Sequence, residues 1–263
     1  MRPRLLPHKR LFLFPILIAS LAAAQEPVIL SNLGEPMRLP YACAEEELAA
    51  AGMSCSATEL CPIYLELTAV APNGPKLLVA GDLHGSSATL ASVLLLSEDS
   101  AATWKEPTAR IRGAAIDQLE FNAKSVWAAG ETQYPLPRDP FFLLSTDGGA
   151  SWRKQPIGEE DSPGTVQRFW FDSPKHGEAI VDAGKTAGGG RYLSYESENG
   201  GESWNLIGGS DKAPKLKHAP PDENSEWRIA TSKDSKAVGI EHRFDGEWLR
   251  AASFAIEVAQ CGK

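Results

Sequence analysis

Short segments of apolar, aromatic and β-branched residues alternate along most of the chain with segments rich in Gly, Pro, Asn and Asp. Tyr64–Val70, Lys76–Gly81 and Val93–Ser97 form one group, and Ile116–Phe121 and Ser125–Gly130 open the next. Strands of antiparallel sheets have this length and composition, and the breaker residues between them mark tight turns. Because helical periodicity is nearly absent, the pattern predicts an all-β fold.

Tryptophan returns at a nearly constant interval among these segments. Aligning the chain on Trp104, Trp152, Trp204 and Trp248 gives spacings of 48, 52 and 44 residues. Self-similarity at this period is typical of propellers and solenoids, and each unit has room for the four short strands of a propeller blade. We therefore predict a β-propeller of four or five four-stranded blades. It occupies 62–263, with repeats at about 62–107, 113–156, 164–207 and 214–260.

A turn motif stands before each of the first three tryptophans. In the best copy, Asp147-Gly148-Gly149 separates two strand patterns. Glycine supplies the positive φ of a tight turn, and the carboxylate accepts backbone N–H bonds inside it. This turn chemistry accounts for the residue types, so we expect a structural role and no catalytic residue here. The motif residues are Ser97, Asp99 and Trp104, then Ser145, Asp147, Gly149 and Trp152, then Ser197, Asn199, Gly201 and Trp204.

The motif resembles the Asp-box, or bacterial neuraminidase repeat, Ser-x-Asp-x-Gly-x-Thr-Trp; the copy at 145–152 matches it with serine for threonine. Together with Leu119-x-Phe121 and Trp127-Ala128-Ala129-Gly130, it is most similar to the photosystem II assembly factor-like and sialidase-like propellers of bacteria. The resemblance covers about 62–254 and implies blades with Asp-box hairpins. Asp-box propellers include glycosidases, binding proteins, assembly factors and receptors, so no single activity is implied.

The first 24 residues have the layout of a secretory signal peptide. Basic residues between positions 2 and 10 precede the apolar run Leu11–Ala24, which ends in a small-residue cleavage pattern at 22–24. The run is shorter than the roughly 20 apolar residues that span a bilayer. We therefore expect cleavage, no transmembrane anchor afterwards, and a periplasmic or secreted protein.

Cleavage after residue 24 would increase the net negative charge of the chain. It removes four basic residues and no acidic ones, which leaves 22 Lys and Arg residues against 34 Asp and Glu residues. Binding to nucleic acid or anionic membranes depends on neutralising phosphate charge, for which such a chain is poorly suited. We expect no nucleic-acid partner, and a monomer.

The cysteine count is even, which favours disulfides in an exported protein. Three cysteines lie in the segment 25–61, ahead of the repeats, and one lies near the C-terminus, so full pairing would join the two ends of the chain. Three connectivities stay open. Phe254–Val258 has the pattern of a final strand, and the two chain ends are expected to build a composite blade. The disulfide candidates are Cys43, Cys55, Cys61 and Cys261.

Cofactor and metal sites are not expected. The cysteines include no Cys-x-x-Cys pair, and no two histidines have metal-ligand spacing. A sialidase would need an arginine triad; the nearest matches to its first motif are Arg38-Leu39-Pro40 and Trp227-Arg228-Ile229-Ala230, and nothing assembles Arg138, Arg168 and Arg191 into the rest.

We expect the binding residues to lie in three loops. Each of these loops joins the second and third strands of one repeat. The loop 131–140 is stiffened by three prolines, which lowers the entropy lost on binding. Its equivalents are 82–87 and 185–190, and the alternative is that all three are ordinary solvated loops. The candidate residues are His84, Tyr134, Arg138, Asp139 and Arg191.

These observations favour an exported, non-enzymatic β-propeller that acts as a protein-binding or assembly module. A carbohydrate-binding or glycoside-cleaving protein of the sialidase-like kind is the alternative, and a structural component of a surface assembly is a third reading. The expected partner is accordingly a protein, with a carbohydrate as the alternative.

Overall fold

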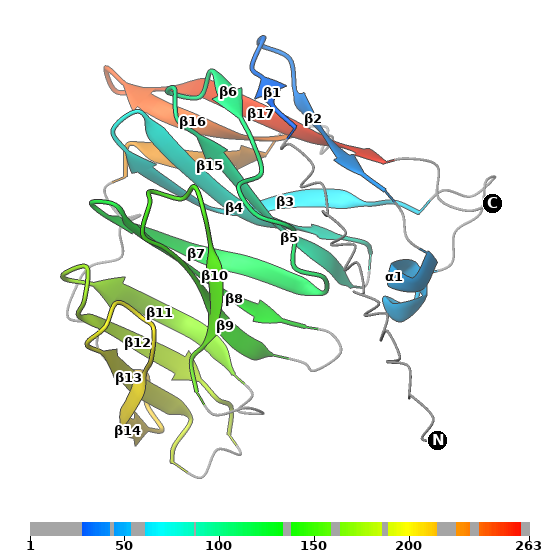
Figure 1. Ribbon diagram of the computed structural model, residues 1–263. Helices are drawn as coiled ribbons and strands as arrows, with labels where there is room; N and C mark the ends of the chain where they lie inside the picture. Colours follow the sequence, from blue (N-terminus) through cyan, green and yellow to red (C-terminus); the bar gives the residue numbers. More distant parts are fainter. Residues whose placement is uncertain are drawn as a thin grey trace, which may run out of the picture.

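The computed structural model describes residues 28–42, 45–53, 61–86, 88–133, 138–158, 164–185, 189–214, 225–231 and 237–258. Within these ranges the chain forms strands and one short helix, α1 (Glu45–Ala50), so the predicted all-β fold is confirmed (Figure 1). No helix among the described residues is long and apolar enough to cross a bilayer. The expected signal peptide at 1–24 lies outside them.

Two regular four-stranded antiparallel sheets form the middle and one end of the molecule. In each, consecutive strands are hydrogen-bonded neighbours, as the repeats predict. Sheet B consists of β7 (Ala114–Asn122), β8 (Ser125–Thr132), β9 (Asp139–Ser145) and β10 (Arg153–Pro156). Sheet C consists of β11 (Thr165–Phe171), β12 (Gly177–Asp182), β13 (Tyr192–Ser197) and β14 (Asn205–Ser210).

Sheet A is built from the first repeat. Its strands are β3 (Tyr64–Asn73), β4 (Lys76–His84) and β5 (Thr89–Ser97). The short β6 (Thr103–Trp104) continues it, because Leu96 and Lys105 exchange backbone hydrogen bonds of 2.8 and 3.0 Å next to β6. β1 (Leu30–Ser31) pairs with β6 on the outside.

Sheet D joins the two ends of the chain. β15 (Trp227–Thr231), β16 (Val238–Phe244) and β17 (Glu247–Val258) are antiparallel, and β2 (Met37–Tyr41) adds to β17 in parallel. Phe254–Val258 pairs residue by residue with β2. The predicted composite sheet is therefore confirmed, with residues of the N-terminal segment supplying its outer strand.

The four sheets are stacked in the order D, A, B, C, with sheets D and C at opposite ends of the stack in Figure 1. One apolar core lies between each neighbouring pair. The largest, between D and A, includes Leu39, Trp104 and Phe254, each at most 1% exposed. The described residues of sheets C and D form no such core between them, so closure of the stack into a ring is not seen.

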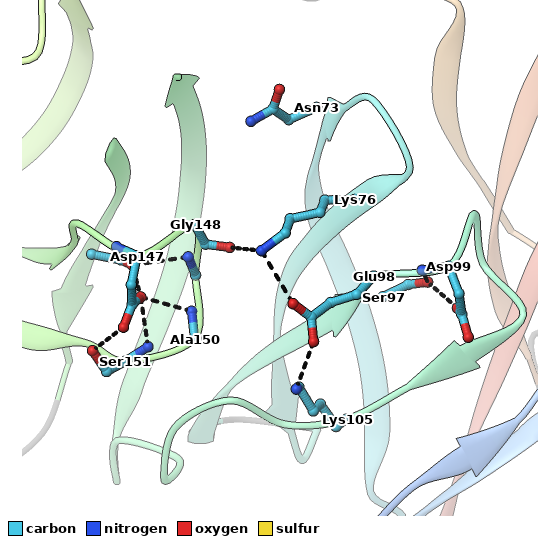
Figure 2. Close-up of polar contacts among 12 residues, drawn as sticks. Asn73, Lys76, Ser97, Glu98, Asp99, Lys105, Asp147, Gly148, Ala150 and Ser151 are labelled. Carbon is cyan, nitrogen blue, oxygen red and sulfur yellow. Dashed lines mark hydrogen bonds and ion pairs between the residues drawn. The ribbon is translucent and has the colours of Figure 1, made fainter. Parts of the chain in front are cut away.

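An Asp-box ties together the outer turn of sheets A, B and C. Both backbone N–H groups of Ala150 and Ser151 donate to Asp147 Oδ1 at 2.9 Å, and Ser151 Oγ donates to Oδ2 at 2.6 Å (Figure 2). These bonds, led by the Ser151 hydroxyl, hold the pKa of Asp147 well below its usual range. Gly148 N in turn donates to Lys124 O at 2.8 Å, which fastens this turn to the first hairpin of the same sheet.

The same turns also hold neighbouring sheets together. Lys76 of sheet A donates to Gly148 O of sheet B and pairs with Glu98 at 3.1 Å (Figure 2). A side chain contacts an Asp-box carbonyl at each packed interface. It comes from the preceding sheet at the A–B and B–C interfaces, and at the D–A interface it is Asn32, which follows β1 and also donates to Ala251 O of β17. The bonds are Asn32 Nδ2 to Ala101 O at 2.9 Å, Lys76 Nζ to Gly148 O at 3.2 Å, and Trp127 Nε1 to Gly200 O at 2.8 Å.

Candidate binding cavity and loop face

The inner strands of sheets A, B and C each carry a β-bulge at the corresponding position. The pairing register shifts at Thr68 in β3, at Asp117 in β7 and at Gln167 in β11, so the bulges lie 49 and 50 residues apart. A bulge leaves one residue unpaired and turns its side chain away from the regular alternation. In β7 it turns a carboxylate toward the inner side of the stack.

Side chains beside the bulges hold the inner strands in place. Thr68 Oγ1 donates to Ile116 O at 2.5 Å, and Gln118 Nε2 donates to Val166 O at 2.6 Å. Each bond reaches the carbonyl directly before the next strand's bulge. These hydrogen bonds hold the inner strands of sheets A, B and C together in the absence of a ligand, which lowers the entropy lost on binding.

A cavity of about 700 Å³ opens where the four inner strands converge, and we call it the central cavity. Residues of β3, β7, β11 and β15 line it, so all four sheets contribute. Its volume lies in the range of ligand pockets, roughly 300–1,000 Å³. The charged lining residues are Asp117, Glu120, Arg168, Glu226 and Arg228, and the larger apolar ones include Val70, Phe169 and Trp227.

Two carboxyl groups of β7 have strongly raised pKa values. Burial raises the pKa of Glu120 to about 7, although Glu120 also accepts a 2.9 Å hydrogen bond from Phe171 N. Asp117 contacts solvent in the cavity, yet the surrounding protein raises its pKa to about 6, and the Glu131 and Glu66 carboxylates add to that shift. Both groups therefore titrate near neutral pH, as acid–base groups in active sites often do.

The two arginines of the cavity differ in their partners. Arg228 forms a 2.7 Å ion pair with Glu241 and lies over the Trp248 ring, 4.3 Å from its centre. Arg168 makes no ion pair within the described part of the chain, so its charge remains available to a ligand. Among the described residues no third arginine lines the cavity, and Arg38 lies in the outer strand β2. A sialidase-type triad is thus not assembled there.

The predicted loop residues lie apart from this cavity, at the ends of the second and third strands. His84 ends β4, and Asp139 opens β9 directly after Arg138, whose φ is +59°. Arg191 binds Asp182 with a 2.7 Å ion pair, and the positive charge of Arg138 also lowers the pKa of Asp182. Tyr134 lies outside the described residues.

Hydrogen bonds join these loop ends from sheet to sheet. Thr89 Oγ1 donates to Gln133 Oε1 at 2.9 Å between sheets A and B, and Thr165 Oγ1 donates to Glu131 Oε2 at 2.6 Å between sheets C and B. The described parts of the three loops therefore belong to one face, which we call the loop face.

Sequence reasoning missed the acids of the central cavity. Asp117 and Glu120 stand inside an apolar strand pattern, Ala114–Asn122. Asp82, which does not line this cavity, stands inside the still more apolar Lys76–His84 and was missed in the same way. A carboxylate at such a position is costly to bury, which is the signal that would have pointed to them.

Comparison with protein-family models and with curated proteins gave no match. Among solved structures, the chain is similar to YCF48 bound to D1 peptide, with 17% identity over 73% of this chain and 54% of that one, and a TM-score of 0.42. It is similar to YCF48 from Cyanidioschyzon merolae, with 15% identity over 72% and 57% of the two chains and a TM-score of 0.38.

A third similar structure is Zg3597, a family 117 glycoside hydrolase of the marine bacterium Zobellia galactanivorans. The identity is 10% over 87% of this chain and 76% of that one, with a TM-score of 0.33. The chain spans little more than half the length of the two YCF48 structures. Its own stacked sheets, with an Asp-box turn in each of sheets A, B and C, make it an all-β protein of propeller-type construction.

Proposed function

We propose that this chain is a non-enzymatic binding module that holds an extended segment of another protein in the central cavity. One observation carries this proposal: four inner strands converge on an open space of about 700 Å³. Its wall holds carboxylates and the guanidinium of Arg168, which makes no ion pair with any residue that the structure describes. The pre-formed hydrogen bonds between inner strands support it, because a rigid site loses little entropy when it binds.

The charges of the wall favour a protein segment over a neutral sugar. Arg168 offers a cation, and Asp117 and Glu226 offer carboxylates, whereas Trp227 and Phe169 add apolar surface beside them. A peptide segment presents charged, polar and apolar side chains together. Arginine and tryptophan are also the residue types that dominate binding energy in protein interfaces.

Glycoside hydrolysis is the second candidate, and one observation favours it. Asp117 and Glu120 lie three residues apart on one strand at the cavity, with pKa values of about 6 and 7. A glycosidase needs one protonated and one ionised carboxyl group beside the scissile bond. The bond that Glu120 accepts from Phe171 N also gives that carboxyl group a role between sheets B and C.

A random-peptide display library, selected on the purified protein, tests the binding proposal. We expect selected peptides to bind the unmodified chain and to bind Arg168→Glu at least tenfold more weakly in calorimetric titration, since the substitution places a carboxylate where the ligand's anion would lie. Lys212→Glu is the matched control, because Lys212 is exposed and does not line the cavity.

Two outcomes would contradict this assignment. Peptides that bind Arg168→Glu and Lys212→Glu equally well would place binding elsewhere. Hydrolysis of a panel of aryl glycosides, lost in both Asp117→Asn and Glu120→Gln, would instead establish the glycosidase.

We also propose export to an oxidising compartment, periplasmic or extracellular. Support comes from the signal-peptide layout and from Cys61, which takes part in a disulfide; the other three cysteines lie outside the described residues. Fractionation of the native cells should find the chain outside the cytoplasm, shortened by about 24 residues on mass spectrometry.

A further inference from the structure

Three side chains with metal-binding atoms meet on the face of sheet A that turns toward sheet B. Glu66 of β3 lies directly opposite Asp82 of β4, and His84 follows two residues further along β4, on the same side of the strand. One oxygen of each carboxylate and one ring nitrogen of His84 all lie within 4.8 Å of one another.

His84 is held in the tautomer that a metal ligand requires. Its Nδ1 lies 2.9 Å from Gly85 O, and because a carbonyl oxygen only accepts, Nδ1 carries the proton. In the neutral imidazole the lone pair is therefore on Nε2, which lies 3.8 Å from Glu66 Oε2. Metal-bound histidines are commonly oriented by this kind of bond to a backbone carbonyl. The Tyr64 ring, 5.6 Å from the imidazole ring, packs beside it.

Asp82 is the observation that points to a ligand. Its residue is only 7% exposed, and within the described part of the chain its carboxylate has no hydrogen-bond donor and no ion pair. A mostly buried carboxylate without a hydrogen-bond donor is costly, because it loses most of its hydration. Burial raises the pKa of Asp82 to about 6; the charge of His84 acts against this shift, and the nearby Glu66 and Asp117 carboxylates add to it.

A second cluster of metal-binding side chains among the described residues differs from this one, because its members already bond one another. His176, Glu196 and Glu198 also come together, but on the surface. There Nδ1 of His176 bonds Asp172 at 2.8 Å, and Nε2 bonds Glu196 at 2.9 Å, so both ring nitrogens are occupied. With both ring nitrogens bonded to carboxylates, His176 leaves no nitrogen free for an added cation.

We propose that Glu66, Asp82 and His84 bind one divalent transition-metal ion, with zinc and manganese as the best-suited ions. One imidazole nitrogen with two carboxylate oxygens suits these ions, whereas calcium and magnesium prefer oxygen ligands alone. Three protein ligands leave at least one coordination position open to water or to a ligand. Because Asp117 of sheet B adds negative charge beside the site, the ion would also relieve repulsion between sheets A and B.

Titration calorimetry of untagged, metal-stripped protein with zinc chloride, and separately with manganese chloride, tests this site. We expect one equivalent of at least one of the two ions to bind, and its affinity to fall at least tenfold in both Asp82→Asn and His84→Gln. Asp82→Asn removes an unpaired buried charge, so this variant should fold at least as well as the unmodified chain. The bound ion should also raise the melting temperature of the unmodified chain and not that of Asp82→Asn.

His176→Gln is the control, since it removes the imidazole of the surface cluster and leaves β3 and β4 intact. It should bind the ion as the unmodified chain does. Loss of binding in His176→Gln with retention in Asp82→Asn would overturn the proposal, and so would the absence of a one-to-one isotherm for both ions at millimolar concentration. Peptide binding in the central cavity is measured on its own, so either proposal can fail without the other.

Discussion

Asp147 and Asn199 occupy the same turn position in sheets B and C and keep the same backbone bond. Ser151 N donates to Asp147 Oδ1 at 2.9 Å, and Ser203 N donates to Asn199 Oδ1 at 3.0 Å. The turn therefore depends on the side-chain oxygen and less on the charge. In sheet A, Ala101 takes the place of the glycine with a φ of +71°, so even the positive backbone angle is retained without glycine.

This comparison predicts the effect of two substitutions at one site. Asp147→Ala removes the acceptor for two backbone N–H groups and two hydroxyls, and we expect the free energy of unfolding to fall by about 1–2 kcal/mol. Asp147→Asn should cost clearly less, because it reproduces Asn199. Urea unfolding at pH 7 measures both values, and equal losses would contradict a role for the oxygen acceptor.

At the scale of the element, strand β2 decides whether the N-terminal segment belongs to the folded unit. Its buried pattern alternates strictly, with Met37, Leu39 and Tyr41 inside and the residues between them exposed. This alternation is typical of a strand with one face on the core. Its parallel pairing with β17 is non-local, so nothing in the neighbouring sequence indicates the partner.

Leu39→Ala should lower the free energy of unfolding by about 2–5 kcal/mol, because Leu39 is fully buried between sheets D and A and the truncation leaves a cavity. Leu33→Ala is the matched control in the same segment, since Leu33 is 86% exposed and its loss should change little. If the two variants melt alike, β2 does not contribute to the folded core.

At the scale of the whole molecule, the carboxyl groups with raised pKa values and those with lowered pKa values change the stability in opposite directions as the pH rises. Asp147, Asp99 and Asp182 have lowered pKa values, so their stabilisation is present above the pKa of an unfolded aspartate and is lost as the pH falls through their folded values. Glu120 has a raised pKa of about 7, so it favours the folded state at low pH, and this contribution is lost as the pH rises from about 4 to about 7.

We therefore expect the Glu120→Gln substitution to flatten the pH dependence of stability. In the unmodified chain, part of the fall in melting temperature between pH 5 and pH 8 comes from ionising Glu120. The variant cannot ionise there, so its curve should fall less over this range. Glu46→Gln, at an exposed position, should follow the unmodified chain. Identical curves for Glu120→Gln and Glu46→Gln would show that Glu120 does not titrate as its burial implies.

The sequence alone determined the class of fold, the repeat length and the turns, because strand alternation, glycine and aspartate in turns, and a recurring tryptophan are local signals. Tertiary structure alone decided which acids meet. Asp117 reaches the central cavity because a bulge turns it inward, and Glu66 meets Asp82 and His84 because β3 and β4 pair in one register. The bulge in β7 and the stacking of the sheets depend on packing between segments distant along the chain, which local patterns do not encode.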